Sequence, residues 1–175
     1  MVLGLSTATF TLLHVIISLI GIASGLVVAG GLWRGKRLGY WTGLFLTTTI
    51  LTSVTGFMFH STSFGPPHIV GVISLVVLAL ALLALYRHRL AGAWRRVYVT
   101  TALLALYLNC FVGVVQAFGK IPALEKLAPT QSEAPFSVAQ LALLTLFVVL
   151  GIVSVRRFRS APREHPGAGD APAST

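Results

Sequence analysis

Charged residues are scarce in this chain, and long stretches of it lack them entirely. Only 10% of the 175 residues are Asp, Glu, Lys or Arg, whereas a soluble domain carries about a quarter. No charge occurs in residues 1–33, 38–86, 97–119 and 134–155. An apolar run of about 18 residues or more can cross the roughly 30 Å hydrocarbon core of a bilayer. The sequence therefore predicts an integral membrane protein whose main partner is the lipid bilayer.

Acidic residues and cysteine are scarcer still. The carboxylates Glu125, Glu133, Glu164 and Asp170 all lie outside the apolar runs. Their placement excludes proton coupling by paired carboxylates within the bilayer and leaves no intramembrane Asp to orient a His for triad chemistry. The single Cys110 excludes an intrachain disulfide and a cysteine-based metal knuckle. HExxH, P-loop and GxSxG motifs are missing as well. The sequence favours a protein that is not an enzyme, and no motif specifies a metal.

The apolar runs divide into five predicted transmembrane helices. The run from 38 to 86 is too long for one span, and it is broken at HSTSFGPP (60–67), where a glycine and two prolines cannot continue a helix. Pro66 and Pro67 suit the first turn of the helix that follows. We expect spans at residues 8–33, 41–59, 68–86, 97–118 and 135–155.

These spans predict an all-α fold, a single integral membrane bundle over residues 1–159. Outside them, PALEKLA (122–128) predicts a short interfacial helix that begins at a proline. Residues 160–175 are rich in Pro, Ala and Gly, which is typical of a disordered tail.

Basic residues give the predicted bundle an orientation. Of the 13 Lys and Arg residues, all except Lys120 and Lys126 follow the first, third or fifth span or precede the fourth. Cytoplasmic loops carry an excess of Lys and Arg, so we expect the N-terminus outside and the C-terminal tail in the cytoplasm. The net charge of +9 belongs to the membrane flanks, and we expect no nucleic-acid partner.

Polar and small residues on these helices follow helical spacing. Asn109, Gly113, Gln116 and Lys120 recur at i, i+4, i+7 and i+11, so they share one face of the fourth predicted helix. Such faces turn towards neighbouring helices rather than lipid. The first predicted helix has a matching face that contains the GxxxG motif at 21–25 and consists of His14, Ser18, Gly21, Gly25 and Ala29.

The predicted topology gathers polar side chains at the external level of the bundle, which suggests a polar pocket that opens outward. In this hypothesis His14 and His68 ligate or hydrogen-bond a cofactor such as haem b or a quinone. Asn109 and Gln116 orient the cofactor, and Lys120 adds positive charge. The residues expected at this level are His14, His60, His68, Gln116, Lys120 and Gln140.

A simpler interpretation explains the same residues by packing alone. His14 is then a neutral imidazole bonded to a carbonyl or to a Ser or Thr of a neighbouring helix. Asn109 and Gln116 bond between helices, and Lys120 extends to the interface. This interpretation favours a structural or accessory subunit, or a small channel or transporter component without a cofactor. Such a protein works as a homo-oligomer or with a partner membrane subunit.

Three segments carry a resemblance. YLNCFVGVVQAFGKIPAL (107–124), LAPTQ (127–131) and HVIISLIGIASGLVV (14–28) resemble a group of small bacterial inner-membrane proteins that has no assigned activity. The resemblance extends over most of residues 10–155. It implies a bacterial source and a place in the inner membrane, and it supplies no catalytic residues.

Overall fold

The structure, a computed structural model, describes residues 6–59 and 65–159. All regular elements within these ranges are helices, so the prediction of an all-α bundle is confirmed. The predicted disordered tail at 160–175 and His60 lie outside the described residues. The elements are α1 (Thr7–Trp33), α2 (Gly39–Phe57), α3 (Pro66–Leu82), the π-helical turn η1 (Leu83–Arg87), α4 (Trp94–Lys120), α5 (Pro122–Glu125) and α6 (Ala134–Arg159).

Local sequence explains where these helices begin and end. Ser6 caps α1 by accepting a hydrogen bond from the Thr9 amide at 3.1 Å. The same helix ends at Trp33, and Gly35 just beyond it has a φ of +71°, the left-handed conformation that glycine adopts readily. The Lys36 amide then donates back to the Gly31 carbonyl at 2.9 Å. Pro66 opens α3, where its missing N–H costs nothing.

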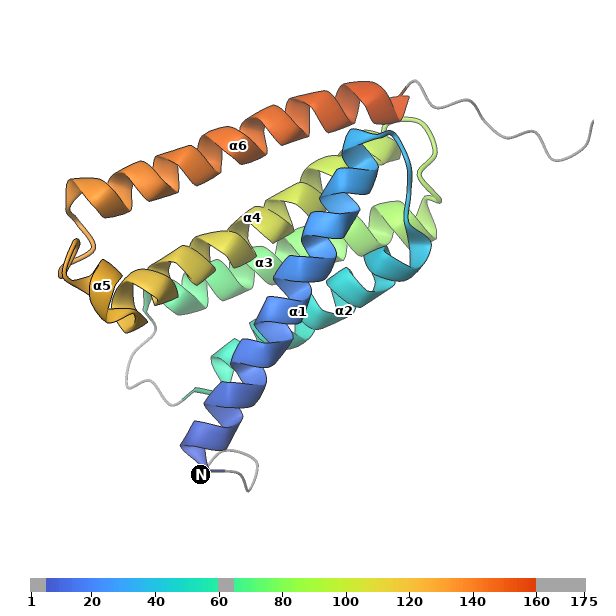
Figure 1. Cartoon of the computed structure of the whole chain (residues 1–175). Coiled ribbons are helices and arrows are strands. Elements are labelled where there is room, and N and C mark those ends of the chain that lie inside the picture. Colours follow the sequence, from blue (N-terminus) through green and yellow to red (C-terminus); the bar gives the residue numbers. More distant parts are fainter. Residues whose placement is uncertain (1–5, 60–64, 160–175) are drawn as a thin grey trace, which may run out of the picture.

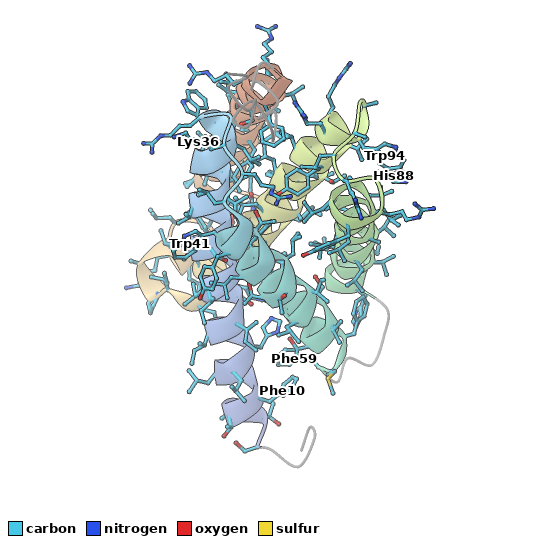
Figure 2. The ribbon with its side chains drawn as sticks, turned by 90° about the vertical axis from the view of Figure 1, so that its right-hand side faces the viewer. Phe10, Lys36, Trp41, Phe59, His88 and Trp94 are labelled. Atoms are coloured by element: carbon cyan, nitrogen blue, oxygen red, sulfur yellow. The ribbon has the colours of Figure 1, made fainter. Side chains whose placement is uncertain are left out.

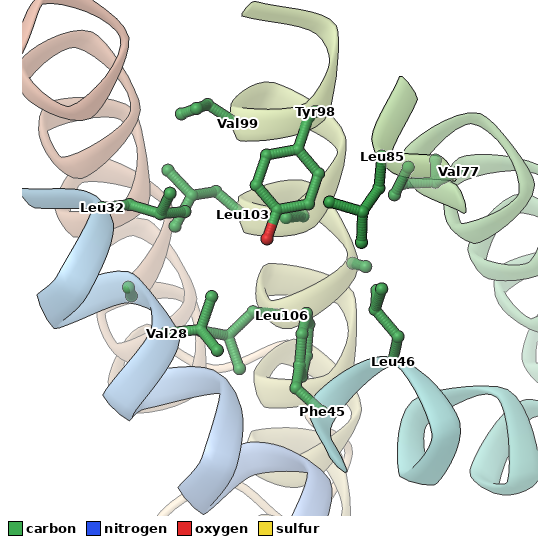
Figure 3. Close-up of a cluster of buried hydrophobic side chains, with 14 of the residues drawn as sticks. Val28, Leu32, Phe45, Leu46, Val77, Leu85, Tyr98, Val99, Leu103 and Leu106 are labelled. Carbon is green, nitrogen blue, oxygen red and sulfur yellow. The ribbon is translucent and has the colours of Figure 1, made fainter. Parts of the chain in front are cut away.

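Helix α4 is the centre of the bundle, because it contacts α1, α2, α3 and α6. The long helices alternate in direction, and α6 lies on the outside against α4 and α1 (Figure 1). Figure 3 shows the core around Tyr98, with Phe45 and Leu106 beside it. Tyr98 is 0% exposed. Core packing therefore joins every long helix to α4.

Four helical segments are long and apolar enough to cross a membrane, namely Thr7–Trp33, His68–Arg87, Trp94–Lys120 and Ala134–Phe158. Large apolar side chains also cover the outside of the bundle, as Leu12 on α1 and Leu141 on α6 are 61% and 62% exposed. Burying such surface in hydrocarbon removes it from water. The chain therefore has the surface and the helices of a membrane protein. Helix α2 has 19 residues but is rich in threonine, and it lies outside this set of four.

Basic residues gather at one end of the bundle, the end labelled by Lys36, His88 and Trp94 in Figure 2. There an Arg157 guanidinium N–H donates to the Trp33 carbonyl at 3.3 Å and lies over the Trp33 ring. An Arg95 N–H donates to the Phe158 carbonyl at 3.4 Å. These contacts tie the C-terminal ends of α1 and α6 to the start of α4. We call this end the basic end.

Candidate functional site

A cluster of polar side chains lies where α1, α2 and α4 meet. A Cβ placed on Gly21 of α1 would lie 3.1 Å from Asn109 Nδ2, 3.3 Å from Thr48 Oγ1 and 3.4 Å from Thr49 Oγ1. Thr52 follows one turn further along α2. The missing side chain at Gly21 thus lets three polar groups approach one point between the helices. We call these five residues the polar junction.

Three atoms of the polar junction lack a hydrogen-bond partner within the described residues. They are Thr49 Oγ1, Thr52 Oγ1 and Asn109 Nδ2, and all three are buried. Thr48 differs, because its hydroxyl donates to the Leu44 carbonyl at 2.7 Å. A buried donor without a partner costs about 1–3 kcal/mol, and such groups are usually paired in native proteins. The junction therefore holds three buried polar atoms whose hydrogen-bonding capacity is not used within the described residues.

His14 lies on the same interface, seven residues before Gly21 and about 10 Å away along the helix. Its Nδ1 lies 2.8 Å from Thr55 Oγ1. The Thr55 proton is already donated to the Leu51 carbonyl at 2.7 Å, so His14 Nδ1 is the donor. A neutral His14 then carries a lone pair on Nε2. The His14 imidazole is thus bonded to a threonine of a neighbouring helix, one of the partners that the packing interpretation expects.

His68 lies apart from His14. Its Nδ1 accepts a hydrogen bond from the Gly65 amide at 3.3 Å, which closes the first turn of α3. Its ring is 5.8 Å from that of Phe57, whereas the His14 ring is 5.2 Å from that of Phe59. Helices α1 and α3 do not touch among the described residues, because α2 packs between them. The structure does not bring the two predicted ligands into one site.

The predicted polar face of α4 is only partly covered by its neighbours. Asn109 is buried at the polar junction, but Gln116 and Lys120 are exposed. The expectation that Gln116 faces the interior was wrong for a geometric reason. Helix α1 crosses the bundle obliquely (Figure 1), and at the level of His14 it packs against α2 instead of α4.

The unpaired hydroxyls of Thr49 and Thr52 were not among the site residues predicted from the sequence. Their signal was present in the threonine-rich composition of α2. Threonines in apolar helices usually bond to carbonyls four residues back, so composition alone does not show which hydroxyl is left without a partner. That information comes from the positions of Gly21 and Asn109 on the facing helices.

Among the described residues, no group of three or more His, Cys, Asp or Glu side chains is placed to hold a metal ion. Known protein families, curated proteins and solved structures provide no match to this chain. The polar junction and His14 are therefore the features from which a function can be inferred.

Proposed function

We propose that this chain is a five-span protein of the bacterial inner membrane, with its N-terminus outside and its C-terminus in the cytoplasm. Helix α2 supplies the fifth span. Its 19 residues extend about 28 Å, and it packs between α1 and α3. The collection of basic residues at one end supports a cytoplasmic position for that end.

In this proposal the polar junction binds a small lipophilic molecule that carries hydrogen-bond acceptors, such as a quinone. The single observation that carries it is the set of three unpaired donors at the junction, Thr49 Oγ1, Thr52 Oγ1 and Asn109 Nδ2. Carbonyl oxygens on an apolar ring would accept these hydrogen bonds while the ring stays in hydrocarbon. Apolar sites with a few polar groups that fix orientation are the usual form of a small-molecule site.

Access from the bilayer supports a lipophilic ligand. His14 is half-buried, so part of its side chain is exposed at the surface of the bundle. The N-terminal end of α1 projects beyond the other helices (Figure 1). His14 adds an acceptor at Nε2 for a ligand hydroxyl. A haem held jointly by His14 and His68 is less well supported, because α1 and α3, which carry the two residues, do not touch among the described residues.

Identification of bound small molecules tests this proposal. The full-length protein is purified in mild detergent, extracted with organic solvent and examined by absorption and mass spectrometry. We expect one lipophilic acceptor molecule to copurify with the wild type and to be lost in Asn109→Leu. The matched control is Gln116→Leu on the same helix, where the side chain is exposed, and it should retain the molecule. No bound molecule in the wild type, or equal retention in both variants, would count against the proposal.

A second candidate, a structural or accessory subunit, is favoured by the close packing beside the junction. A Cβ on Gly25 would lie 2.5 Å from Leu106 Cδ1, so α1 and α4 are in tight contact one turn from Gly21. In that case ordered water fills the junction, and the protein acts through its apolar surface on a partner membrane subunit or a second copy. Copurification of a stoichiometric membrane protein, with no small molecule bound, would support this candidate.

A further inference from the structure

A cavity of about 380 Å³ opens at the basic end. Its lining residues come from four adjoining segments: the link between α1 and α2, the start of α2, η1, and the turn after η1. The volume is within the range of about 300–1,000 Å³ that is typical of small-molecule sites. The lining residues are Arg37, Gly39, Thr42, Leu85, Tyr86 and Arg89.

The two arginines of the cavity reach it from connections that are far apart in the sequence. Arg37 lies in the short link between α1 and α2. Arg89 lies in the α3–α4 turn, where Arg89 and Leu90 adopt φ values of +46° and +58°. This left-handed conformation is costly for residues other than glycine, and such strain is concentrated at functional sites.

Packing on either side of Arg89 keeps this turn in place. Leu90 packs against the apolar core. The His88 ring stacks on that of Trp94, with centroids 3.7 Å apart and an interplanar angle of 2°. The Leu90 amide also donates to the Ala84 carbonyl at 3.0 Å. The backbone at Arg89 is thus held in place by its neighbours in the turn.

No carboxylate compensates this positive charge within the described part of the chain, since Glu125 and Glu133 belong to the segment between α4 and α6 at the opposite end. The cavity also includes the start of α2, which has no side-chain cap. Unpaired amides at a helix start favour an anion. A Cβ on Gly39 would have no neighbour within 4 Å, so the backbone there is open.

We propose that this cavity binds a phosphate group, with Arg37 and Arg89 as its charged partners and the first turn of α2 as a further donor. The ligand is an anionic phospholipid headgroup or a soluble phosphorylated molecule, which share this chemistry. Exposed Tyr86, at the rim, suits the interface between headgroups and hydrocarbon. The proposal depends on a bundle embedded in a membrane and does not depend on a ligand at the polar junction.

Thermal unfolding of the delipidated full-length protein in neutral detergent tests this proposal. The probes are dihexanoyl phosphatidylglycerol, dihexanoyl phosphatidylcholine and inorganic phosphate at constant ionic strength. We expect phosphatidylglycerol to raise the unfolding midpoint saturably, and Arg37→Gln with Arg89→Gln to weaken this effect at least roughly tenfold. The matched control, Arg34→Gln with Arg96→Gln, removes the same charge from exposed positions at the same end, and it should retain the response.

The outcomes separate the sources of the phosphate. A response to phosphatidylglycerol alone identifies a lipid headgroup, and an equal response to inorganic phosphate identifies a soluble ligand. Either response supports the site if the Arg37 and Arg89 substitutions weaken that response. If the double variant does not fold, Arg89→Gly is used, since glycine suits the positive φ. No saturable response to any probe, or equal losses in the cavity and control variants, overturns the proposal.

Discussion

Gly25 of α1 lies against Leu106 of α4 so closely that a Cβ on Gly25 would be 2.5 Å from Leu106 Cδ1. The ring of Phe45 would lie 2.8 Å from the same added Cβ. Phe45 is 1% exposed. Leu106 and Phe45 both belong to the central core. The contact therefore fixes the distance between α1, α2 and α4, and with it the geometry of the polar junction one turn away.

Gly25→Ala is expected to destabilise the bundle by about 1–3 kcal/mol, because overpacking forces core side chains out of place. The control is Gly30→Ala on the same helix, where a Cβ would have no neighbour within 4 Å and alanine favours the helix. Reversible unfolding in mixed micelles measures both free energies. Equal stability of the two variants would contradict the close packing.

Tyr98→Phe tests the buried pair at the basic side of the core. Tyr98 and Thr42 hydroxyls are 3.3 Å apart, and both residues are buried. Losing this hydrogen bond should cost about 1 kcal/mol of unfolding free energy, since the Thr42 hydroxyl is left buried. Tyr40→Phe should change nothing, because Tyr40 is 77% exposed. A Tyr98→Phe variant as stable as the wild type would show that the pair contributes no stability.

Asn109→Leu should change the stability of the protein differently with and without the proposed ligand. In ligand-free protein the change removes a buried donor that has no partner, so stability should stay constant or rise by up to about 1 kcal/mol. In protein saturated with ligand, the variant should be the less stable one, because it loses the linked binding energy. Unfolding midpoints measured before and after ligand extraction give this comparison. A large loss of stability in both states would indicate a structural role for Asn109.

Glu133 gives a prediction on pH dependence outside the spans. Desolvation raises the pKa of Glu133, but the hydrogen bonds from the Thr130 hydroxyl and from backbone amides together lower it more, so the net pKa is below the usual 4.5. The carboxylate therefore stabilises the turn before α6 above pH 4.5, and this contribution is lost as the pH falls through the lowered pKa. Hydrogen exchange at the Thr130 and Ser132 amides, corrected for intrinsic rates, should accelerate over that interval. Glu133→Gln should show faster exchange at neutral pH, and unchanged rates would contradict this role.

The helices were predictable from sequence because the bilayer imposes long apolar segments separated by charge. Each predicted span coincides with a long helix, and the proline-led PALEKLA segment begins the short α5. The left-handed turn at Arg89 and Leu90 was not predictable, because the packing of Leu90 on the core determines it.

The burial of a site residue could be predicted from sequence only where the spacing along one helix decides it. Helical spacing placed Asn109 on an inward face, and it is buried. The same spacing failed for Gln116 because a periodic face does not reveal where a neighbour crosses. We expected His14 and His68 together because both lie near one end of their helices. In the bundle, however, the helices that carry them, α1 and α3, each contact α2 and do not contact each other.

Single-cysteine labelling measures the proposed membrane topology. In a Cys110→Ser background, Lys36→Cys, Met58→Cys, Ala91→Cys and Ala123→Cys are treated with a membrane-impermeant maleimide in intact cells. We predict labelling at positions 58 and 123 only, with 36 and 91 labelled after the membrane is opened. Labelling of 36 and 58 from the same side would contradict the span of α2, and labelling of 36 and 91 in intact cells would contradict the proposed orientation.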